Sequence, residues 1–289
     1  MRDFVITTDN TSDLPKEYYQ EHGIEYLYLP YTIDGVVYNK NNELPYKEFY
    51  QTMRNGSMPT TSQYNPEDAK KVFTEILQSG KDVLHLAFSS GLSGSYNSAR
   101  IAMEELMEEM PEGNVVVVDT LAASMGEGLL VYKAVQMKEA GESMETIAAW
   151  LEKNKLHACH VFTVDDLFHL FRGGRVSRTT AVIGTMINIK PILHVNDEGR
   201  LISLSKTRGR KKSMTALLSM MEERIGSFRD KNDVVMISHG DCEEDARYLE
   251  KLVEEQFGIT NIMINPVGAT IGAHTGPGVI TLFFMGDFR

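Results

Sequence analysis

The sequence predicts an α/β protein with two domains, in which the N-terminal domain has a mostly parallel sheet with flanking helices. The C-terminal domain is expected to be α/β with a mixed sheet. In the first half, short runs rich in Val and Ile alternate with longer amphipathic segments, as in βαβ units. In the second half, two apolar runs joined by "NDEG" indicate a β-hairpin. The 289 residues suffice for two ordinary domains, which we place at 1–160 and 161–289.

The elements of the first half follow from hydrophobic periodicity. Continuous apolar runs such as "FVITTD" and "VVVVD" are typical of buried parallel strands, whereas helices repeat apolar residues every three to four positions. The expected strands are 4–9, 83–88 and 115–119. The expected helices are 66–79, 95–110, 124–140 and 143–154.

The elements of the second half mix strand and helix in a less regular order. A helical pattern at 179–189 precedes the hairpin of residues 190–206. A long helix over 210–227 follows, then a strand over 234–240 and a helix over 243–256. A short strand over 261–266 and a final apolar run over 279–286 complete this half.

Composition restricts the class of partner. The formal net charge of −11 argues against nucleic acid or an anionic membrane, because both require basic surface. Two distant cysteines without a CxxC pattern do not support a zinc site and fit a reducing compartment. No run approaches the ~20 apolar residues of a membrane span. We therefore expect a soluble, cytoplasmic protein with no metal, no nucleic-acid partner and no stable membrane insertion.

The three N-terminal strands end in polar residues. The polar pairs at these strand ends are Thr8 and Asp9, Ser89 and Ser90, and Asp119 and Thr120. In open α/β sheets, ligands bind beyond the carboxyl ends of the strands. A binding site is therefore expected at this edge of the N-terminal sheet.

The loop "SSGLSGSY" (89–96) leads directly into an amphipathic helix. Backbone N–H groups, serine hydroxyls and the positive end of a helix dipole together can bind an anion. A plain serine-capped helix is an equally good interpretation of this loop alone.

Two further polar segments each allow two interpretations. "MPTTSQYNPED" (58–68) places Thr61 and Ser62 beside a helix that Asn65 would cap with Pro66 in its first position. "FRGGRVSR" (171–178) allows Arg172 or Arg175 to reach a carboxylate or phosphate with its planar guanidinium. Alternatively, its glycines end a helix and Arg175 is a surface charge.

Near the C-terminus, "GATIGAHTGPGVI" (268–280) places His274 in what reads as a glycine-rich turn, where its ring could face a ligand or bond a local carbonyl. "SKTRGRKKS" (205–213) has five basic residues in an acidic chain, which makes a docking surface for an anionic partner or phosphate plausible. A basic run can also be only a solvated face.

Common catalytic signatures are missing. The sequence has no GxSxG nucleophile elbow, no GxxxxGK[ST] or GxGxxG nucleotide fingerprint, and no HExxH motif. A triad of Ser93, His274 and an aspartate is not specified by any motif. Sixteen methionines could line an adaptable channel, but methionine at helical spacing is more often core.

Taken in order, these segments resemble the DegV family over nearly the whole chain. The matching segments are "TTDNTSDLP", "TTSQ", "SSGLSGSY", "VVVVDTLAASMGEG", "LFRGGRVS", "NIKPIL" with its hairpin, "KTRGRKK" and "GAHTGPG". The resemblance implies a DegV-like fold of two domains that bind one long-chain fatty acid between them. It also implies the role of lipid-binding subunit of a bacterial fatty acid kinase, without catalytic residues or a cofactor of its own. A separate ATP-binding kinase subunit would phosphorylate the carboxylate to an acyl phosphate.

The resemblance assigns the head-group site and the docking surface residue by residue. The residues expected to bind the carboxylate end of the fatty acid are Thr61, Ser62, Ser93, Gly94, Arg175, His274 and Thr275. The residues expected to dock the kinase subunit are Lys206 and Arg208. A different class of function is a stand-alone acyl hydrolase or acyltransferase that uses Ser93 and His274.

Overall fold

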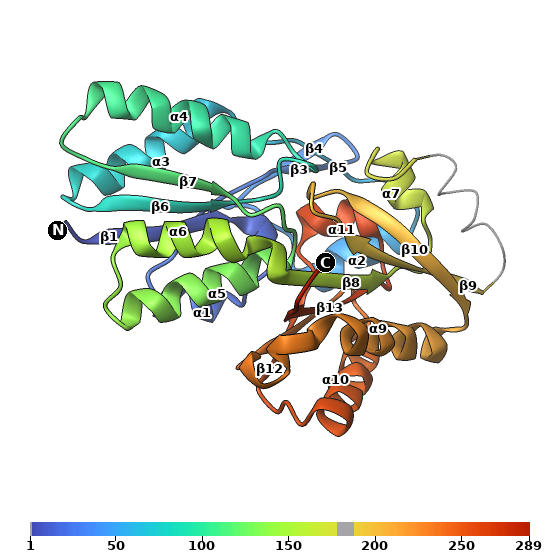
Figure 1. Ribbon diagram of the computed structural model, residues 1–289. Coiled ribbons are helices and arrows are strands. Elements are labelled where there is room, and N and C mark those ends of the chain that lie inside the picture. The colour runs from blue at the N-terminus through green and yellow to red at the C-terminus, as the bar shows by residue number, and fades with distance from the viewer. Residues whose placement is uncertain (1, 178–187) are drawn as a thin grey trace.

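The computed structural model describes residues 2–177 and 188–289 and arranges them around two main sheets (Figure 1). The first sheet is parallel, with strand order β2 (Glu25–Leu27), β1 (Phe4–Asp9), β6 (Asp82–Ala87) and β7 (Val115–Asp119). Every strand of this sheet therefore ends at the same edge. The predicted polar strand ends, among them Asp9 and Asp119, meet at that edge.

Helices cover both faces of the parallel sheet. On one face lie α3 (Pro66–Gln78) and α4 (Ser95–Glu109), and on the other lie α1 (Lys16–Glu21), α5 (Met125–Glu139) and α6 (Met144–Asn154), as Figure 1 shows. Asn65 caps α3: its side chain accepts from the Asp68 N–H at 2.9 Å, and the Asp68 carboxylate accepts from the Asn65 N–H. This reciprocal pair satisfies two backbone donors that a helix start leaves free.

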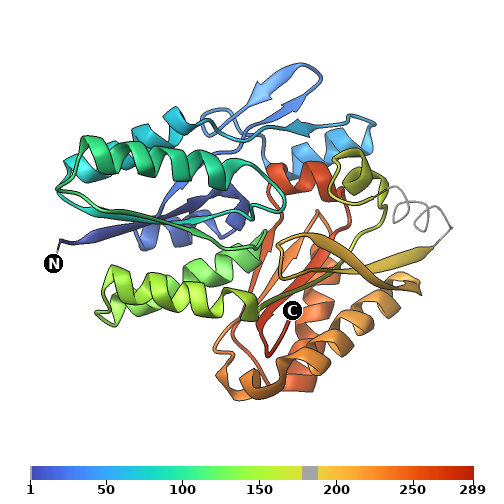
Figure 2. The ribbon, with the colours of Figure 1, turned by 45° about the horizontal axis from the view of Figure 1, so that its top comes forward.

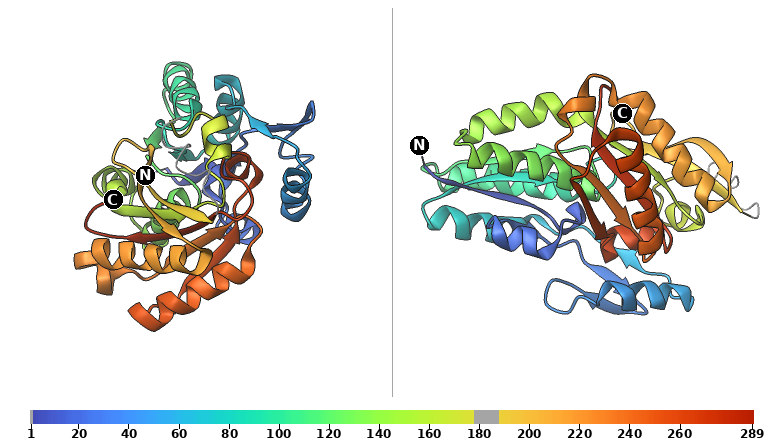
Figure 3. Two further views of the ribbon diagram at one scale, coloured as in Figure 1. Left: turned by 90° about the vertical axis from the view of Figure 1, so that its right-hand side faces the viewer. Right: turned by 90° about the horizontal axis from the view of Figure 1, so that it is seen from below.

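The second sheet is mixed. Its order is β10 (Leu201–Arg208), β9 (Ile189–Val195), β8 (Ala158–Thr163), β13 (Ile280–Met285), β11 (Val235–His239) and β12 (Ile262–Pro266). Only β11 and β12 pair in parallel within this sheet. Helices α9 (Arg210–Ile225) and α10 (Glu243–Phe257) pack side by side on one face (Figure 3). On the other face, α5 contacts β8, β11 and β13 as well as the parallel sheet, so it joins the two sheets.

A third, three-stranded antiparallel sheet was not expected from the sequence. It consists of β4 (Val36–Tyr38), β3 (Tyr31–Ile33) and β5 (Thr60–Thr61), and its hairpin projects from the edge of the molecule (Figure 2). With α2 (Tyr46–Arg54), this sheet packs against α11 (Ala269–Thr275) around the buried Tyr31 and Phe49. Residues 28–61 of the first half thus lie against a helix of the second half.

Most sequence-predicted elements agree with the structure within two residues. The hairpin, the three N-terminal strands, the four N-terminal helices, and the strand and two helices of the second half are confirmed. The helix predicted at 179–189 lies outside the described residues except for Asn188, in a turn, and Ile189, which begins β9. The remaining short elements are α7 (Phe168–Arg172) and the 3-10 helices Asn10–Ser12, Lys155–His157 and Gly226–Lys231.

The predicted domain boundary at 160 falls within β8, and the division into 1–160 and 161–289 stays a prediction. None of the helices in the described ranges is long and apolar enough to cross a bilayer.

Candidate functional site: an apolar cavity with a polar mouth

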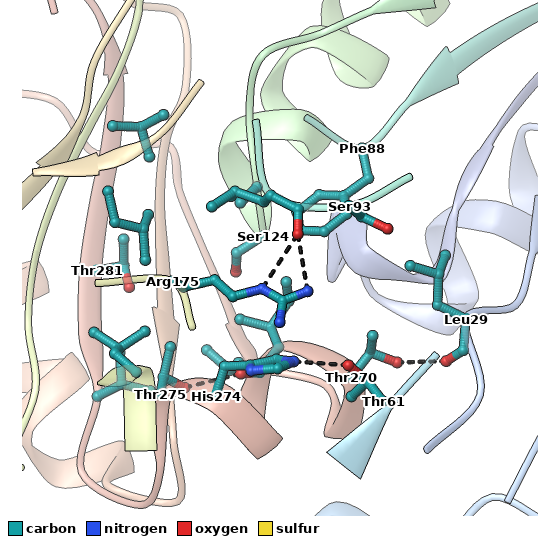
Figure 4. A pocket seen from close by; sticks show the side chains of 18 of the residues that line it. Leu29, Thr61, Phe88, Ser93, Ser124, Arg175, Thr270, His274, Thr275 and Thr281 are labelled. Atoms are coloured by element: carbon teal, nitrogen blue, oxygen red, sulfur yellow. Dashed lines mark hydrogen bonds between the residues drawn. The ribbon is translucent and has the colours of Figure 1, made fainter. Parts of the chain in front are cut away.

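A cavity of about 400 Å³ lies between the carboxyl edge of the parallel sheet and the mixed sheet (Figure 4). Its volume lies within the range of small-molecule sites. Most of its wall is apolar, and the apolar residues come from both halves of the chain: Leu29, Phe88, Leu92, Ala123, Phe162, Leu170, Val195, Leu201, Val267, Ile271, Val279 and Phe283. None of the lining residues that the structure describes is a methionine, so the methionines described here serve as core or surface.

The structure brings all seven predicted head-group residues to the wall of this cavity. They come from four segments that are far apart in the sequence, and they are Thr61, Ser62, Ser93, Gly94, Arg175, His274 and Thr275. Ser62 is exposed and Arg175 is half-buried, so these residues form the end of the cavity that is open to solvent. Their role in binding a ligand stays a prediction.

His274 and Thr61 form the direct link between the two halves of the site. The Thr61 hydroxyl and His274 Nε2 share a hydrogen bond of 2.7 Å (Figure 4). Burial, together with the charges of Arg175 and Arg172, lowers the pKa of His274 to about 3. The imidazole is therefore neutral near pH 7, and it can offer a hydrogen bond but no positive charge.

The interpretation of His274 as part of a glycine-rich turn was wrong. His274 lies in the last turn of α11, because the segment from Ala269 to Thr275 is helical and Gly276 (φ 73°) ends it. The ring packs against Gly173, the residue that follows α7, and a Cβ at Gly173 would overlap His274 Nδ1. The paired glycines thus serve two purposes, since Gly174 (φ 74°) also takes the left-handed conformation that ends α7.

Arg175 supplies the positive charge of the site. Its Nε and Nη2 donate to the Leu92 carbonyl at 3.2 and 2.9 Å, and its Nη1 donates to the Gly173 carbonyl. These bonds hold the side chain against the Ser93 loop, so the interpretation of Arg175 as a free surface charge was wrong. Burial lowers the pKa of the guanidinium, which nevertheless remains a cation at any physiological pH. Five N–H groups are available to an arginine, and three of them are used here, which leaves two for a ligand.

Arg172, the alternative anion-binding residue, serves the fold. Its Nη2 donates to the carbonyls of Pro59 and Ala273 at 2.7 and 3.1 Å. It does not line the cavity. The side chain therefore ties α7 to the segments that carry Thr61 and His274.

The Ser93 loop leads into α4 and forms part of the cavity wall, but the N-cap residue of α4 is Gly94 and no side chain caps the helix. The N–H of Ser95 donates to the Ser93 hydroxyl at 3.2 Å, and Gly94 directly precedes α4. The side chain of Gln63 lies over Gly94, where a Cβ would overlap its amide oxygen, and Gln63 Nε2 donates to Ser98 Oγ at 3.3 Å. The TTSQ and SGLSG segments are thus held together. The interpretation of the loop as a plain serine-capped helix is wrong, and the Ser93 hydroxyl, which accepts from Ser95, still has a proton to donate.

The remaining predicted residues divide between the site and the surface. Thr275 is buried and its hydroxyl donates to the Ile271 carbonyl at 3.3 Å. Lys206 and Arg208 are exposed on β10, an edge strand of the mixed sheet, and do not line the cavity. Their predicted role in docking a partner requires such exposure.

The predicted head-group residues leave out five polar residues of the wall: Gln63, Ser124, His160, Thr270 and Thr281. Gln63, Ser124 and Thr270 could have been found, because they lie in the segments "TTSQ", "VVVVDTLAASMGEG" and "GATIGAHTGPGVI" that the sequence analysis singled out. His160 and Thr281 lie in the apolar strands β8 and β13, where nothing in the pattern separates a residue facing a cavity from a residue facing the core.

The two residues of the alternative enzyme are not arranged as a nucleophile and its base. The structure describes both Ser93 and His274 and shows no hydrogen bond between them. His274 Nε2 is engaged by Thr61, and its Nδ1, against Gly173, has no partner. Within the described residues, no group of three or more His, Cys, Asp or Glu side chains could hold a metal ion.

Two sheets with an apolar cavity between them and a polar mouth define a ligand-binding α/β protein. The family model described as "Uncharacterised protein, DegV family" matches residues 3–287, and the chain belongs to the DegV family. A DegV domain-containing protein of Clostridium perfringens is 46% identical over 291 residues, which cover 100% of this chain and 99% of that protein.

Solved structures of similar proteins share this fold. A fatty-acid-binding DegV family protein from Thermus thermophilus has 32% identity and a TM-score of 0.87, covering 99% of this chain and 100% of that one. A stearic-acid-binding protein from Eubacterium ventriosum has 26% identity and a TM-score of 0.91, covering 98% of each chain. The fatty-acid-binding DegV of Bacillus subtilis has 28% identity and a TM-score of 0.85, covering 99% of this chain and 100% of that one. The predicted α/β fold with one parallel and one mixed sheet is confirmed.

Proposed function

We propose that this protein binds one long-chain fatty acid in the cavity and presents the carboxylate to a separate ATP-binding kinase subunit, which phosphorylates it to an acyl phosphate. The observation that carries the proposal is the division of one cavity wall into a long apolar part and a short polar end with a cation. The fatty acids bound by similar structures support it. We expect the protein to act in the cytoplasm.

At the polar end, hydroxyls and a guanidinium would receive the carboxylate. Arg175 would supply the charge with its two remaining N–H groups. Because His274 Nδ1 has no acceptor, a proton there would be a buried, unpaired donor, which favours the tautomer with the proton on Nε2. His274 would then donate to Thr61, and the Thr61 hydroxyl would be free to donate to the carboxylate.

In the apolar part, the acyl chain would supply most of the affinity. A chain of about fifteen methylenes gains on the order of 12 kcal/mol gross at ~0.8 kcal/mol per methylene. Association and ordering take back a good part of that gain. A hydrogen bond to a charged group adds about 1.5–3 kcal/mol. The tail therefore sets affinity, and the polar end fixes the orientation in which the carboxylate faces the mouth.

Presentation to a partner would explain a polar mouth in which the described residues pair no nucleophile with a base. Neutral His274 is bonded to Thr61 rather than to Ser93, so an unaided acyl transfer lacks its base. The exposed Lys206 and Arg208 offer basic surface on an acidic chain, which would suit an acidic patch on the kinase subunit.

The test of lipid binding is denaturing extraction of the purified protein followed by mass spectrometry of the lipids, with native mass spectrometry for stoichiometry. We expect one fatty acid per chain. A protein that is empty and also fails to take up added fatty acid would refute the proposal.

The test of presentation is phosphorylation of the bound fatty acid by a bacterial fatty acid kinase subunit with ATP. Arg208→Glu should slow acyl phosphate formation at limiting kinase while fatty acid binding is unchanged. Lys251→Glu, a charge reversal on exposed α10, is the matched control and should act as the wild type. If the wild type, Arg208→Glu and Lys251→Glu form acyl phosphate at equal rates, the docking surface is removed from the proposal. If the protein turns over an acyl substrate without the kinase subunit, the stand-alone acyl hydrolase or acyltransferase is favoured instead.

A further inference from the structure

Along β8 and β13, the cavity extends from its mouth to a pair of aromatic rings. At the start of β13 and along it, the wall consists of Val279, Thr281 and Phe283, which share one face because they alternate. Val279 belongs to the same apolar cluster as Val176, the neighbour of Arg175, so it marks the end near the mouth. At ~3.4 Å per residue, Phe283 lies about 14 Å farther along the strand.

His160 stands opposite Phe283 and completes the end of the wall. The two residues are register partners on β8 and β13, and their rings meet edge to face with centroids 5.5 Å apart. The next residues on the same face of the two strands are Ala158 and Met285, which are buried in the core and do not line the cavity. In this direction the cavity therefore ends at His160 and Phe283.

A glycine of α5 makes room for the imidazole of His160. Gly126 lies in the first turn of α5, so close to the ring that a Cβ on it would overlap Nε2. Gly126 does not line the cavity, so the imidazole stands between the cavity and the helix. Neither ring nitrogen has a hydrogen-bond partner in the described part of the chain, so packing fixes the ring. The position of the end wall therefore depends on the size of the side chains at positions 126 and 160.

We propose that the His160 ring, backed by Gly126, is the stop that sets the longest acyl chain this cavity accepts. This proposal rests on the proposed function, because it places the carboxylate at the mouth and the methyl end toward the mixed sheet. An extended chain rises about 1.25 Å per carbon, given a C–C bond of ~1.52 Å, so about eleven carbons cover the distance from Val279 to Phe283. A long-chain fatty acid held at the mouth therefore reaches the ring.

The test is the affinity of the delipidated full-length protein for saturated fatty acids of twelve to twenty carbons, measured at pH 7.5 by displacement of a fluorescent fatty acid. For the wild type, affinity should rise about fourfold with each added carbon and stop rising at one length, because a further methylene must displace a close-packed ring. His160→Ala leaves the space of the imidazole empty, so the length at which affinity stops rising should increase by about two carbons.

Gly126→Ala tests the same wall in the opposite direction. The added methyl pushes the imidazole away from α5 and toward the cavity, so the longest accepted chain should become shorter by about one or two carbons. The double variant Gly126→Ala, His160→Ala should accept chains at least as long as the wild type does. Val161→Ala is the control, because Val161 lies on the other face of β8, in the core that contains residues of α9. It should lose stability but keep the wild-type chain length.

The outcomes separate this proposal from the proposed function. If the wild type binds the series but neither His160→Ala nor Gly126→Ala changes the length at which affinity stops rising, the stop is refuted and fatty acid binding stands. A wild-type affinity that keeps rising through twenty carbons refutes the stop by itself. If no fatty acid binds to the wild type, both proposals fail. Should one variant not fold, the other decides, because each predicts a shift of its own sign. An equal shift in Val161→Ala would refute the assignment to His160.

Discussion

Two polar clusters within this fold differ in whether their hydrogen-bond donors are already used within the protein. The first, the sheet cluster, consists of Thr8, Asp9, Thr11, His85 and Glu127, all fully buried and none of them lining the cavity. Glu127 accepts from the hydroxyls of Thr8 and Thr11 at 2.9 Å each. One Asp9 oxygen accepts from the Phe88 N–H at 2.9 Å. The other lies 3.6 Å from His85 Nε2 and has no hydrogen-bond partner among the described residues.

The second, the cavity cluster, consists of Thr61, Ser93, Arg175 and His274. It retains capacity for further bonds: two guanidinium N–H groups and the proton of the Ser93 hydroxyl. The comparison teaches that burial of polar groups alone does not mark a site. A cluster whose donors are bonded within the core stabilises the fold, and a cluster that faces a cavity with donors left over is available to a ligand.

The largest expected effect tests the sheet cluster. Glu127→Leu leaves the Thr11 hydroxyl and the Asp9 N–H without their acceptor in the core. It also removes one partner of the Thr8 hydroxyl, which keeps the Leu86 carbonyl. The free energy of unfolding should therefore fall by about 3 kcal/mol. Urea denaturation followed by circular dichroism measures this loss. Fatty acid affinity, corrected for the folded fraction, should not change.

Glu127→Gln is the matched control for this prediction. Burial and the neighbouring Asp9 raise the pKa of Glu127 well above its usual value, which favours the neutral form, and an amide imitates that form closely. Its loss of stability should be about 1 kcal/mol or less. A weaker fatty acid affinity in the folded fraction of Glu127→Leu would show that the sheet cluster is not closed off from the site.

Much of the fold could be predicted because its long elements carry strong periodicity. The strands β1, β6 and β7 and the amphipathic α3 and α10 each bury one face or both, and that pattern is local. The strands β3, β4 and β5 have two or three residues each, too few for a period to appear. They are stabilised instead by contacts with α11, more than two hundred residues away.

The mouth of the site could be predicted because it lies in loops whose glycines and hydroxyls interrupt the apolar pattern. Ser93 and Arg175 stand out in such loops, and the resemblance to the DegV family assigns both of them to one head-group site. The charge state of His274 could not be predicted, because it depends on burial by residues from α7 and β5. The part of the cavity wall formed by β8 could not be predicted either. His160 and Phe162 lie on one face of β8 at the two-residue spacing that any strand has.

The second effect tests the cavity cluster. Thr61→Val removes the hydroxyl that links His274 to the carboxylate, and fatty acid affinity should fall about tenfold, the loss of one hydrogen bond to a charged group. Unfolding free energy should change by only about 1 kcal/mol. Thr60→Val, the exposed neighbour on β5, is the control and should bind normally. An affinity unchanged by Thr61→Val would remove this residue from the head-group site.

A smaller expected effect is a pH dependence of the unfolding free energy that comes from Asp9 in the sheet cluster. Burial raises the pKa of Asp9 to about 7, against 3.8 for a free aspartate, so the folded protein binds more protons than the unfolded chain between these values. Stability from this group is full below pH 3.8 and is lost as pH rises toward 7. Asp9→Asn should therefore be as stable as the wild type near pH 4.5 and more stable near pH 8, on the order of 1 kcal/mol. The urea denaturation midpoints of both proteins at pH 4.5 and pH 8 measure this difference. If the midpoint changes equally with pH in both proteins, the prediction is contradicted.

The smallest expected effect concerns the charge on His274 during binding. Because its pKa is about 3, the imidazole is uncharged from pH 6 to pH 8, and Arg175 alone supplies the charge of the cavity cluster. The ratio of wild-type to Thr61→Val affinity for a fatty acid should then stay constant within about twofold across this range. Calorimetric titrations of both proteins at four pH values measure the ratio, which cancels the ionisation of the fatty acid itself. A ratio that changes with a midpoint near pH 6.5 would mean that His274 is protonated in the binding site and acts as a second cation there.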